Sequence, residues 1–150
     1  MAQGARMEDA AAICELINYY AERGRMLHRS LESTYESVRD FLVCRRNGHV
    51  VGCIALSVSW KDLAEIRSLA IDPDCRDQGL GRELLLGAIE DAGKLGLTKI
   101  FVLTYEVSFF AKFGFRQVEK DTLPTKIWRD CIHCPRADAC DEAAMILELD

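Results

Sequence analysis

One glycine-containing turn, between an apolar strand and an amphipathic helix, limits the folds open to this chain more than any other feature. The strand is predicted over residues 64–71 and the helix over 79–95, and the turn reads Arg76-Asp77-Gln78-Gly79-Leu80-Gly81-Arg82. Its two glycines let the backbone approach a ligand closely. The N–H groups of the first helical turn have no partners within the helix, and the helix dipole adds positive potential there. The turn is therefore predicted to bind a phosphate group.

The residues in and around the turn give both support for phosphate binding and arguments against two known nucleotide-binding motifs. Arg76 and Arg82 add positive charge. The dinucleotide-binding fingerprint fits poorly because Leu84 stands where its third glycine is needed, and no phosphate loop ending in Lys-Ser or Lys-Thr is present. Taken alone, glycines at this spacing are equally consistent with a helix start that only makes a tight turn.

The charge balance shows that any anion site must be local. The 19 Lys and Arg against 24 Asp and Glu give a net charge of −5, which argues against disorder and against broad binding to nucleic acid. No apolar run approaches membrane-spanning length, and residues 1–9 lack a signal-peptide pattern, so we expect a cytoplasmic protein with no membrane partner. The 150 residues predict a single domain over 1–150, with a core over about 5–120 and a cysteine-containing tail and last strand over 121–150.

Short helices and strands follow one another without a strict strand–helix–strand repeat. Asn47-Gly48 tolerates positive φ and predicts a hairpin between the β-rich segments on either side. Leu31, Tyr35 and Val38 are predicted to form the buried stripe of a helix. Besides the strand and helix above, the predicted elements are helices over 10–24, 30–40 and 107–113 and strands over 41–45, 50–59, 100–104, 115–119 and 145–149. This order predicts the α+β class.

Three segments resemble, in order and spacing, the acetyl-CoA motifs of the GNAT superfamily of N-acetyltransferases. They are residues 68–73, the turn at 76–81, and Phe109-Phe110-Ala111-Lys112-Phe113-Gly114-Phe115. The resemblance implies a three-layer α+β fold, with a central, twisted, mixed but mostly antiparallel sheet flanked by helices. It also implies acetyl-CoA as the cosubstrate, with the coenzyme diphosphate on the backbone N–H groups from Gln78 to Arg82.

The same resemblance implies how the rest of the coenzyme is held. Its pantetheine arm pairs like an extra strand with the main chain of Leu69 and Ile71. The implied coenzyme-binding residues are Leu69, Ala70, Ile71, Arg76, Asp77, Gln78, Gly79, Leu80, Gly81, Arg82 and Phe110.

Within the superfamily, the sequence looks most similar to short bacterial N-acetylglutamate synthases. Residues 26–30, 64–70 and 103–104 carry this further likeness, together with the tail around Trp128. It implies acetyl transfer to the α-amine of L-glutamate, as the first step of arginine biosynthesis. We expect direct transfer in a ternary complex, and a homodimer is a candidate assembly. Another amino acid, a polyamine or a protein amine is an alternative acceptor. A non-catalytic acyl-CoA-binding sensor is the alternative outside the enzymes.

Acetyl transfer needs a base, because an amine is mostly protonated at neutral pH. Glu65 is the candidate, acting directly or through a water molecule. Strand alternation predicts that Glu65, Arg67, Leu69 and Ile71 share one face. The alternative is that Glu65 and Arg67 form a solvated ion pair on an exposed sheet face.

The residue that protonates the leaving thiolate is less clear from the pattern. Many superfamily members have a tyrosine where this chain has Phe110, which has no hydroxyl group to donate. The thiolate then leaves unprotonated or takes a proton from water, with Tyr105 as the fallback donor. Alternatively, Tyr105 only fills space between a strand and a helix.

A glutamate acceptor would need cations for its carboxylates, and arginine binds a carboxylate through two parallel hydrogen bonds. Arg29 and Arg67 are the candidates, and Arg25 is a less favoured neighbour. Thr104 is predicted to add a hydrogen bond. The alternatives are a solvated surface position for Arg29 and a locally satisfied hydroxyl at a strand end for Thr104.

Three of the seven cysteines, Cys131, Cys134 and Cys140, lie together in the tail. Structural zinc usually takes four ligands from two paired knuckles, and only one knuckle is present. Zinc is therefore considered but not favoured over reduced, packed thiols, and a redox-responsive pair is the third interpretation. The scattered cysteines, including Cys75, are interpreted as structural thiols, which favours direct transfer over a thioester on the enzyme.

Overall fold

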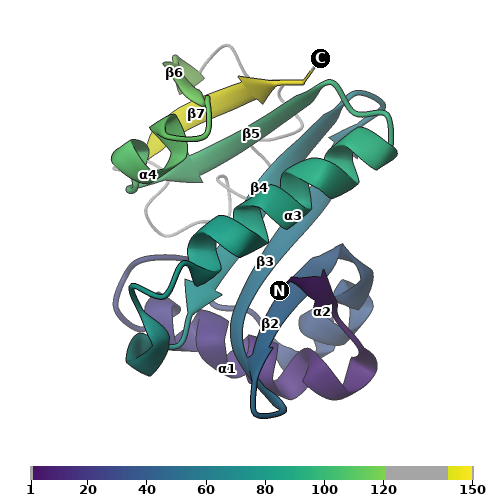
Figure 1. The fold of residues 1–150 in the computed structure, drawn as a ribbon, viewed down its shortest axis with the longest axis vertical. Helices are drawn as coiled ribbons and strands as arrows, with labels where there is room; N and C mark the ends of the chain where they lie inside the picture. The colour runs from purple at the N-terminus through teal and green to yellow at the C-terminus, as the bar shows by residue number, and fades with distance from the viewer. Residues whose placement is uncertain (1, 121–141, 150) are drawn as a thin grey trace.

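A mixed β-sheet forms the centre of the protein (Figure 1). The computed structural model describes residues 2–120 and 142–149, which contain seven strands in the order β1-β2-β3-β4-β5-β7-β6. Strands β4 and β5 run parallel, and every other neighbouring pair is antiparallel. The strands are β1 (Gln3–Gly4), β2 (Phe41–Arg46), β3 (His49–Trp60), β4 (Leu63–Ile71), β5 (Lys99–Thr104), β6 (Arg116–Val118) and β7 (Ala143–Glu148).

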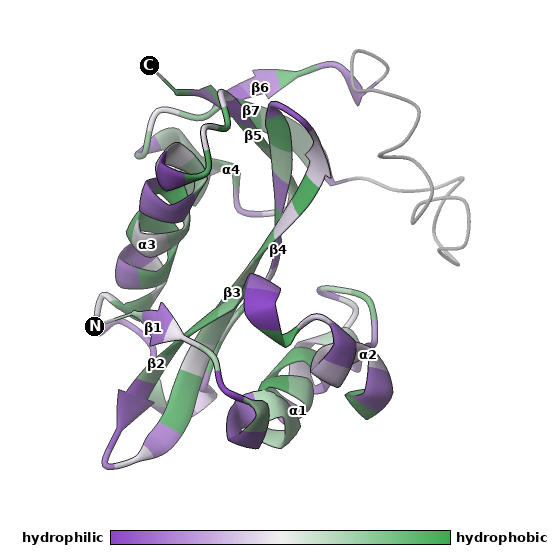
Figure 2. Ribbon diagram, turned by 90° about the vertical axis from the view of Figure 1, so that its right-hand side faces the viewer, coloured by the Kyte–Doolittle hydropathy of each residue, from purple (hydrophilic) through white to green (hydrophobic). Residues whose placement is uncertain are grey.

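Helices cover both faces of this sheet (Figure 2). The α-helices are α1 (Ala10–Ala21), α2 (Leu31–Glu36), α3 (Leu80–Lys94) and α4 (Val107–Ala111), and short 3-10 turns are η1 (Met7–Asp9), η2 (Val38–Asp40) and η3 (Pro73–Cys75). Leu84 and Leu85 of α3 pack with Ile54 and Ile66 on one face, whereas α1 packs on the other. The predicted three-layer α+β fold is confirmed. Within the described part of the chain, no helix has the length and apolarity needed to cross a membrane.

The predicted hairpin is confirmed, but the second helix differs from its prediction. Asn47 and Gly48 have φ values of 54° and 79° between β2 and β3. The side chains of Leu31 and Tyr35 are 43% and 42% exposed, so they form no buried stripe. Thr34 is buried in their place, and its Oγ1 donates a hydrogen bond to Ser30 O at 2.9 Å. The helix ends at Glu36, and a separate 3-10 turn follows.

A β-bulge in β4 overturns the prediction that Glu65, Arg67, Leu69 and Ile71 share one face. Ser68 has a φ of 55°, and Ser68 and Leu69 together face one residue of β3 between the Ala55–Arg67 and Cys53–Ala70 pairs. The extra residue reverses the alternation. Leu69 and Ile71 therefore pack toward α3, and Glu65 and Arg67 lie on the opposite face.

The same region of β4 separates from its parallel neighbour. Pairing between β4 and β5 runs from the Leu63–Lys99 pair to the Ile66–Val102 pair and ends there. Beyond it, the last residues of β4 continue toward η3 and α3, while β5 continues toward α4. The two strands therefore part in the middle of the sheet, which exposes the edge of β4 that faces away from β3.

Candidate active site

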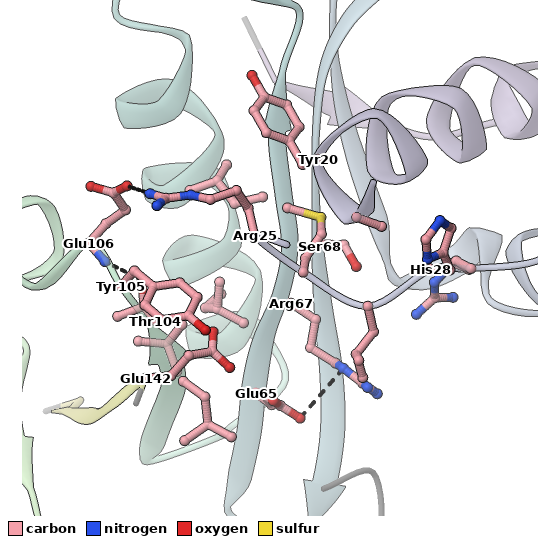
Figure 3. Close-up of a pocket in the computed structure, with 18 of the residues that line it drawn as sticks. Tyr20, Arg25, His28, Glu65, Arg67, Ser68, Thr104, Tyr105, Glu106 and Glu142 are labelled. Atoms are coloured by element: carbon pink, nitrogen blue, oxygen red, sulfur yellow. Dashed lines mark hydrogen bonds and ion pairs between the residues drawn. The ribbon is translucent and has the colours of Figure 1, made fainter. Parts of the chain in front are cut away.

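A cleft of about 1420 Å³ lies where β4 and β5 part. Its walls come from both strands, from the connection between α1 and α2, and from the start of α4 (Figure 3). This volume exceeds the roughly 300–1,000 Å³ of a usual small-molecule site.

The predicted phosphate-binding turn has the backbone geometry that anion binding requires. Gly79 adopts a φ of 77° as the N-cap of α3, and the helical bonds begin with Glu83 N–H donating to Gly79 O at 3.1 Å. The N–H groups of Leu80, Gly81 and Arg82 precede that first bond and point out of the helix end. A Cβ placed on Gly81 would lie 3.4 Å from the Phe109 ring, so this turn lies close against α4.

The implied coenzyme residues divide into two groups in space. Leu69, Ile71, Arg76 and Phe110 line the cleft, whereas residues 77–82 lie beyond its wall at the start of α3. The side chains of Ala70 and Leu80 are buried in the core, which leaves only their main chains for a ligand. Phe110 is likewise buried, in edge-to-face contact with Phe109 and Phe115.

Glu65 and Arg67 form an ion pair inside the cleft. Their Oε1 and Nε atoms are 3.7 Å apart, and the side chains are 16% and 28% exposed (Figure 3). The pair considered as an alternative in the sequence is therefore present, but it lines a cleft instead of an open sheet face. Its partial burial strengthens the interaction relative to a surface pair.

Arg29 enters the cleft from the connection between α1 and α2. Asn18 fixes its main chain, because Asn18 Nδ2 donates to Arg29 O and Arg29 N–H donates to Asn18 Oδ1, both at 2.9 Å. The guanidinium lies 5.2 Å from the centre of the Phe41 ring. Burial raises the pKa of Asp40, and the positive charges of Arg29 and Arg67 oppose this rise. Both arginines therefore act electrostatically on the same carboxyl group, and both line the cleft.

The far wall of the cleft carries Thr104 and Tyr105. Thr104 is buried, and its Oγ1 accepts a hydrogen bond from Glu106 N–H at 2.8 Å. This agrees with the alternative interpretation, in which the hydroxyl is satisfied locally at the strand end. The Tyr105 ring lies 5.4 Å from the guanidinium of Arg25. That guanidinium also pairs with Glu106 at 2.5 Å, across 81 sequence positions (Figure 3). Arg25 thus connects the α1–α2 segment to the wall opposite β4.

Three further residues of the cleft, Tyr20, Glu106 and Glu142, were not expected from the sequence. Glu142 lies just before β7, and Tyr20 is on the last turn of α1. No local pattern could identify them, because each reaches the cleft only through the fold.

Two of the scattered cysteines have weakly nucleophilic thiols. Cys44 and Cys53 are buried, and burial raises the pKa of both thiols, that of Cys53 to about 12. A thiol acts as a nucleophile only after losing its proton, so neither is suited to carry an acetyl group. Among residues 2–120 and 142–149, no three potential ligands gather into a metal site. The cysteines predicted as a low-ranked zinc site, Cys131, Cys134 and Cys140, lie outside the described residues.

In the folded protein at pH 8, an iodoacetamide label is expected to leave Cys53 and Cys44 unmodified, because their raised pKa values keep both thiols protonated. The half-buried Cys14 and Cys75 should react first. Peptide mapping by mass spectrometry gives the label at each position, and a sample unfolded in guanidinium serves as the control in which all four react. Rapid labelling of Cys53 in the folded protein would contradict this account.

The protein thus has a mixed sheet with helices on both faces and a cleft where two parallel strands part. The sequence model of the acetyltransferase (GNAT) family matches residues 8–115. The chain therefore belongs to the GNAT family, and it is an acetyl-CoA-dependent N-acetyltransferase.

Relatives and solved structures agree with this assignment. An uncharacterised N-acetyltransferase of Chlorobaculum tepidum is 44% identical over 98% of this chain and 95% of its own length. An amino-acid acetyltransferase of Mycobacterium tuberculosis is 38% identical over 83% of this chain and 72% of its own length. A Neisseria gonorrhoeae N-acetylglutamate synthase, solved with coenzyme A and N-acetyl-glutamate, superposes with a TM-score of 0.89 at 29% identity; the match covers all of this chain and 35% of that one.

Proposed function

We propose that this enzyme transfers the acetyl group of acetyl-CoA directly to the α-amine of an amino acid, L-glutamate, and so catalyses the first step of arginine biosynthesis. The observation that carries the proposal is that Arg29 and Arg67 line one cleft, in which Arg67 is paired with Glu65. Two guanidinium groups suit an acceptor with two carboxylates. The names of the mycobacterial and gonococcal relatives support the same class of acceptor.

In this proposal the coenzyme crosses from the turn before α3 to the exposed edge of β4. Its diphosphate binds the N–H groups from Gln78 to Arg82, with Arg76 adding charge, because a helix start attracts anions. The pantetheine arm runs along the main chain of Leu69 and Ile71 as an added strand. The side chains of these two residues point toward α3. Because of the bulge, their main chain remains available to the pantetheine arm, and Glu65 and Arg67 on the opposite face remain available to the acceptor.

The proposed reaction begins with loss of a proton from the acceptor ammonium to Glu65, directly or through one water. The amine nitrogen then attacks the thioester carbonyl and a carbon–nitrogen bond forms. The nitrogen loses its second proton to water, and the carbon–sulfur bond breaks. The departing thiolate takes a proton from water or from Tyr105, because Phe110 has none to give. No acetyl group passes through a cysteine, in keeping with the raised thiol pKa values of Cys44 and Cys53.

A cationic acceptor is a second candidate. Three carboxylates, Glu65, Glu106 and Glu142, line the cleft, although Glu65 and Glu106 are paired with arginines. A polyamine or a protein amine would use these carboxylates, whereas glutamate would use the arginines.

A panel of acceptors assayed for release of coenzyme A tests the choice. We expect glutamate to turn over with the highest kcat/KM, above glutamine, aspartate, lysine, spermidine and a peptide amine. Glutamine isolates the second carboxylate, because it keeps the size of glutamate and removes one charge. Turnover of spermidine or the peptide without glutamate would establish the cationic acceptor instead. Binding of acetyl-CoA without turnover of any of these acceptors would reject both candidates.

A further inference from the structure

Tyr20, on the last turn of α1, joins two parts of the proposed coenzyme site. Its hydroxyl donates a hydrogen bond to the carbonyl oxygen of Ile71, the last residue of β4. The same hydroxyl oxygen accepts a hydrogen bond from Nη2 of Arg76 at 3.3 Å. Two hydrogen bonds in series therefore link a guanidinium at the start of the phosphate turn to the end of the strand.

The carbonyl that Tyr20 contacts faces the coenzyme edge of β4. Asp72 N–H donates to Val51 O on β3 at 2.7 Å, and the carbonyl of Ile71 belongs to the same trans peptide group, so it points away from β3. Strand β5 pairs with β4 only as far as Ile66, so it does not cover this carbonyl. A carbonyl oxygen has two lone pairs, so the hydroxyl of Tyr20 leaves capacity for a second donor.

The ring of Tyr20 is itself fixed in place. The Tyr19 ring packs edge-on against it, with the ring centres 5.0 Å apart. The guanidinium carbon of Arg76 lies 5.7 Å from the centre of the Tyr20 ring. Arg76 is otherwise exposed, and an exposed arginine loses rotamer freedom when it binds an anion. A contact that already restricts the guanidinium reduces this cost.

We propose that Tyr20 is a positioning residue for coenzyme A: anchored on the carbonyl oxygen of Ile71, its hydroxyl holds the Arg76 guanidinium at the cleft for the coenzyme. The inference rests on the proposed coenzyme site. Tyr20 lies at the opposite end of the labelled residues from Glu65 and Arg67 (Figure 3), so its effect falls on the coenzyme and not on the acceptor.

The test uses Tyr20→Phe, which removes the hydroxyl and keeps the ring. We expect the Kd of coenzyme A, measured by calorimetry, and the KM of acetyl-CoA to rise about fivefold, equivalent to about 1 kcal/mol. The kcat and the acceptor KM should remain unchanged. Tyr19→Phe is the matched control, because it removes a hydroxyl from the adjacent ring, outside the cleft, and should leave every constant at its wild-type value.

A double-mutant cycle with Arg76→Gln separates positioning from general stability. If Tyr20 acts through Arg76, the double variant binds coenzyme A no more weakly than Arg76→Gln alone. Additive losses, an unchanged Kd in Tyr20→Phe, or an equal fall in kcat would each overturn the inference. The proposed coenzyme site has its own test in Gly81→Glu: if that variant loses coenzyme A while Tyr20→Phe does not, the site stands and only the role of Tyr20 is rejected.

Discussion

A Gly81→Glu variant is expected to lose at least about 100-fold in affinity for coenzyme A. Position 81 lies in the first turn of α3, where the N–H groups are proposed to hold the diphosphate. Two like charges about 4 Å apart near a protein surface repel by about 4 kcal/mol, more than enough for this loss. The added Cβ would meet the Phe109 ring at 3.4 Å, which is ordinary contact, so the loss would report charge and not a clash. Calorimetry with coenzyme A measures it.

Two variants control this experiment. Gly93→Glu places the same charge on the same helix, at a position where a Cβ meets nothing within 4 Å, and should keep wild-type affinity. Gly81→Ala adds the Cβ without the charge and should retain most of the binding. If Gly81→Glu melts like the wild type and still binds coenzyme A normally, the phosphate turn is assigned wrongly.

A Glu65→Gln variant is expected to lower kcat at pH 7 by about 100-fold, the lower end of the usual contribution of a general base. The amide keeps the shape of the side chain but accepts no proton. The deficit should shrink as pH rises, because more of the acceptor amine is then already deprotonated. The kcat and the acceptor KM, measured from pH 6.5 to 9.5, give the profile.

The ion pair with Arg67 suggests a second role for Glu65, in which it orients Arg67. The pH profile of kcat and of the acceptor KM distinguishes this role from that of a general base. If Glu65 only orients Arg67, its replacement raises the acceptor KM and leaves the pH dependence of kcat as in the wild type. Arg67→Gln provides the comparison, because it removes the other half of the 3.7 Å pair and should act mainly on the acceptor KM. A parallel pH profile in Glu65→Gln would remove Glu65 as the base.

Local signals in the sequence predict the elements well. Asn47-Gly48 specifies a hairpin because its residues tolerate positive φ, and the Gly79 position specifies the start of α3 for the same reason. Apolar periodicity identifies the core face of α3, where Leu84, Leu85 and Ala88 are buried. In α2 the periodicity misleads, since this helix has only six residues and buries Thr34 while Leu31 and Tyr35 stay exposed.

The site is less predictable, because it depends on contacts distant in the sequence and on one irregular residue. Ser68 carries no turn signature, yet the bulge at its positive φ puts Leu69 and Ile71 on the face opposite Glu65 and Arg67. Tyr20 and Glu106 are held at the cleft by contacts with Ile71 and Arg25, which lie 51 and 81 positions away in the sequence. The motif before α3 could be recognised because one continuous segment contains it.

The position of β7 in the sheet determines when the sheet can be completed during synthesis. Strand β7 lies between β5 and β6, both of which leave the ribosome before it does. Until residues 143–148 emerge, β5 and β6 have a strand-wide gap between them, and unpaired strand edges favour association with other chains. Among the described strands, the hydrogen-bonded sheet is therefore complete only when the last one to be synthesised lies between β5 and β6.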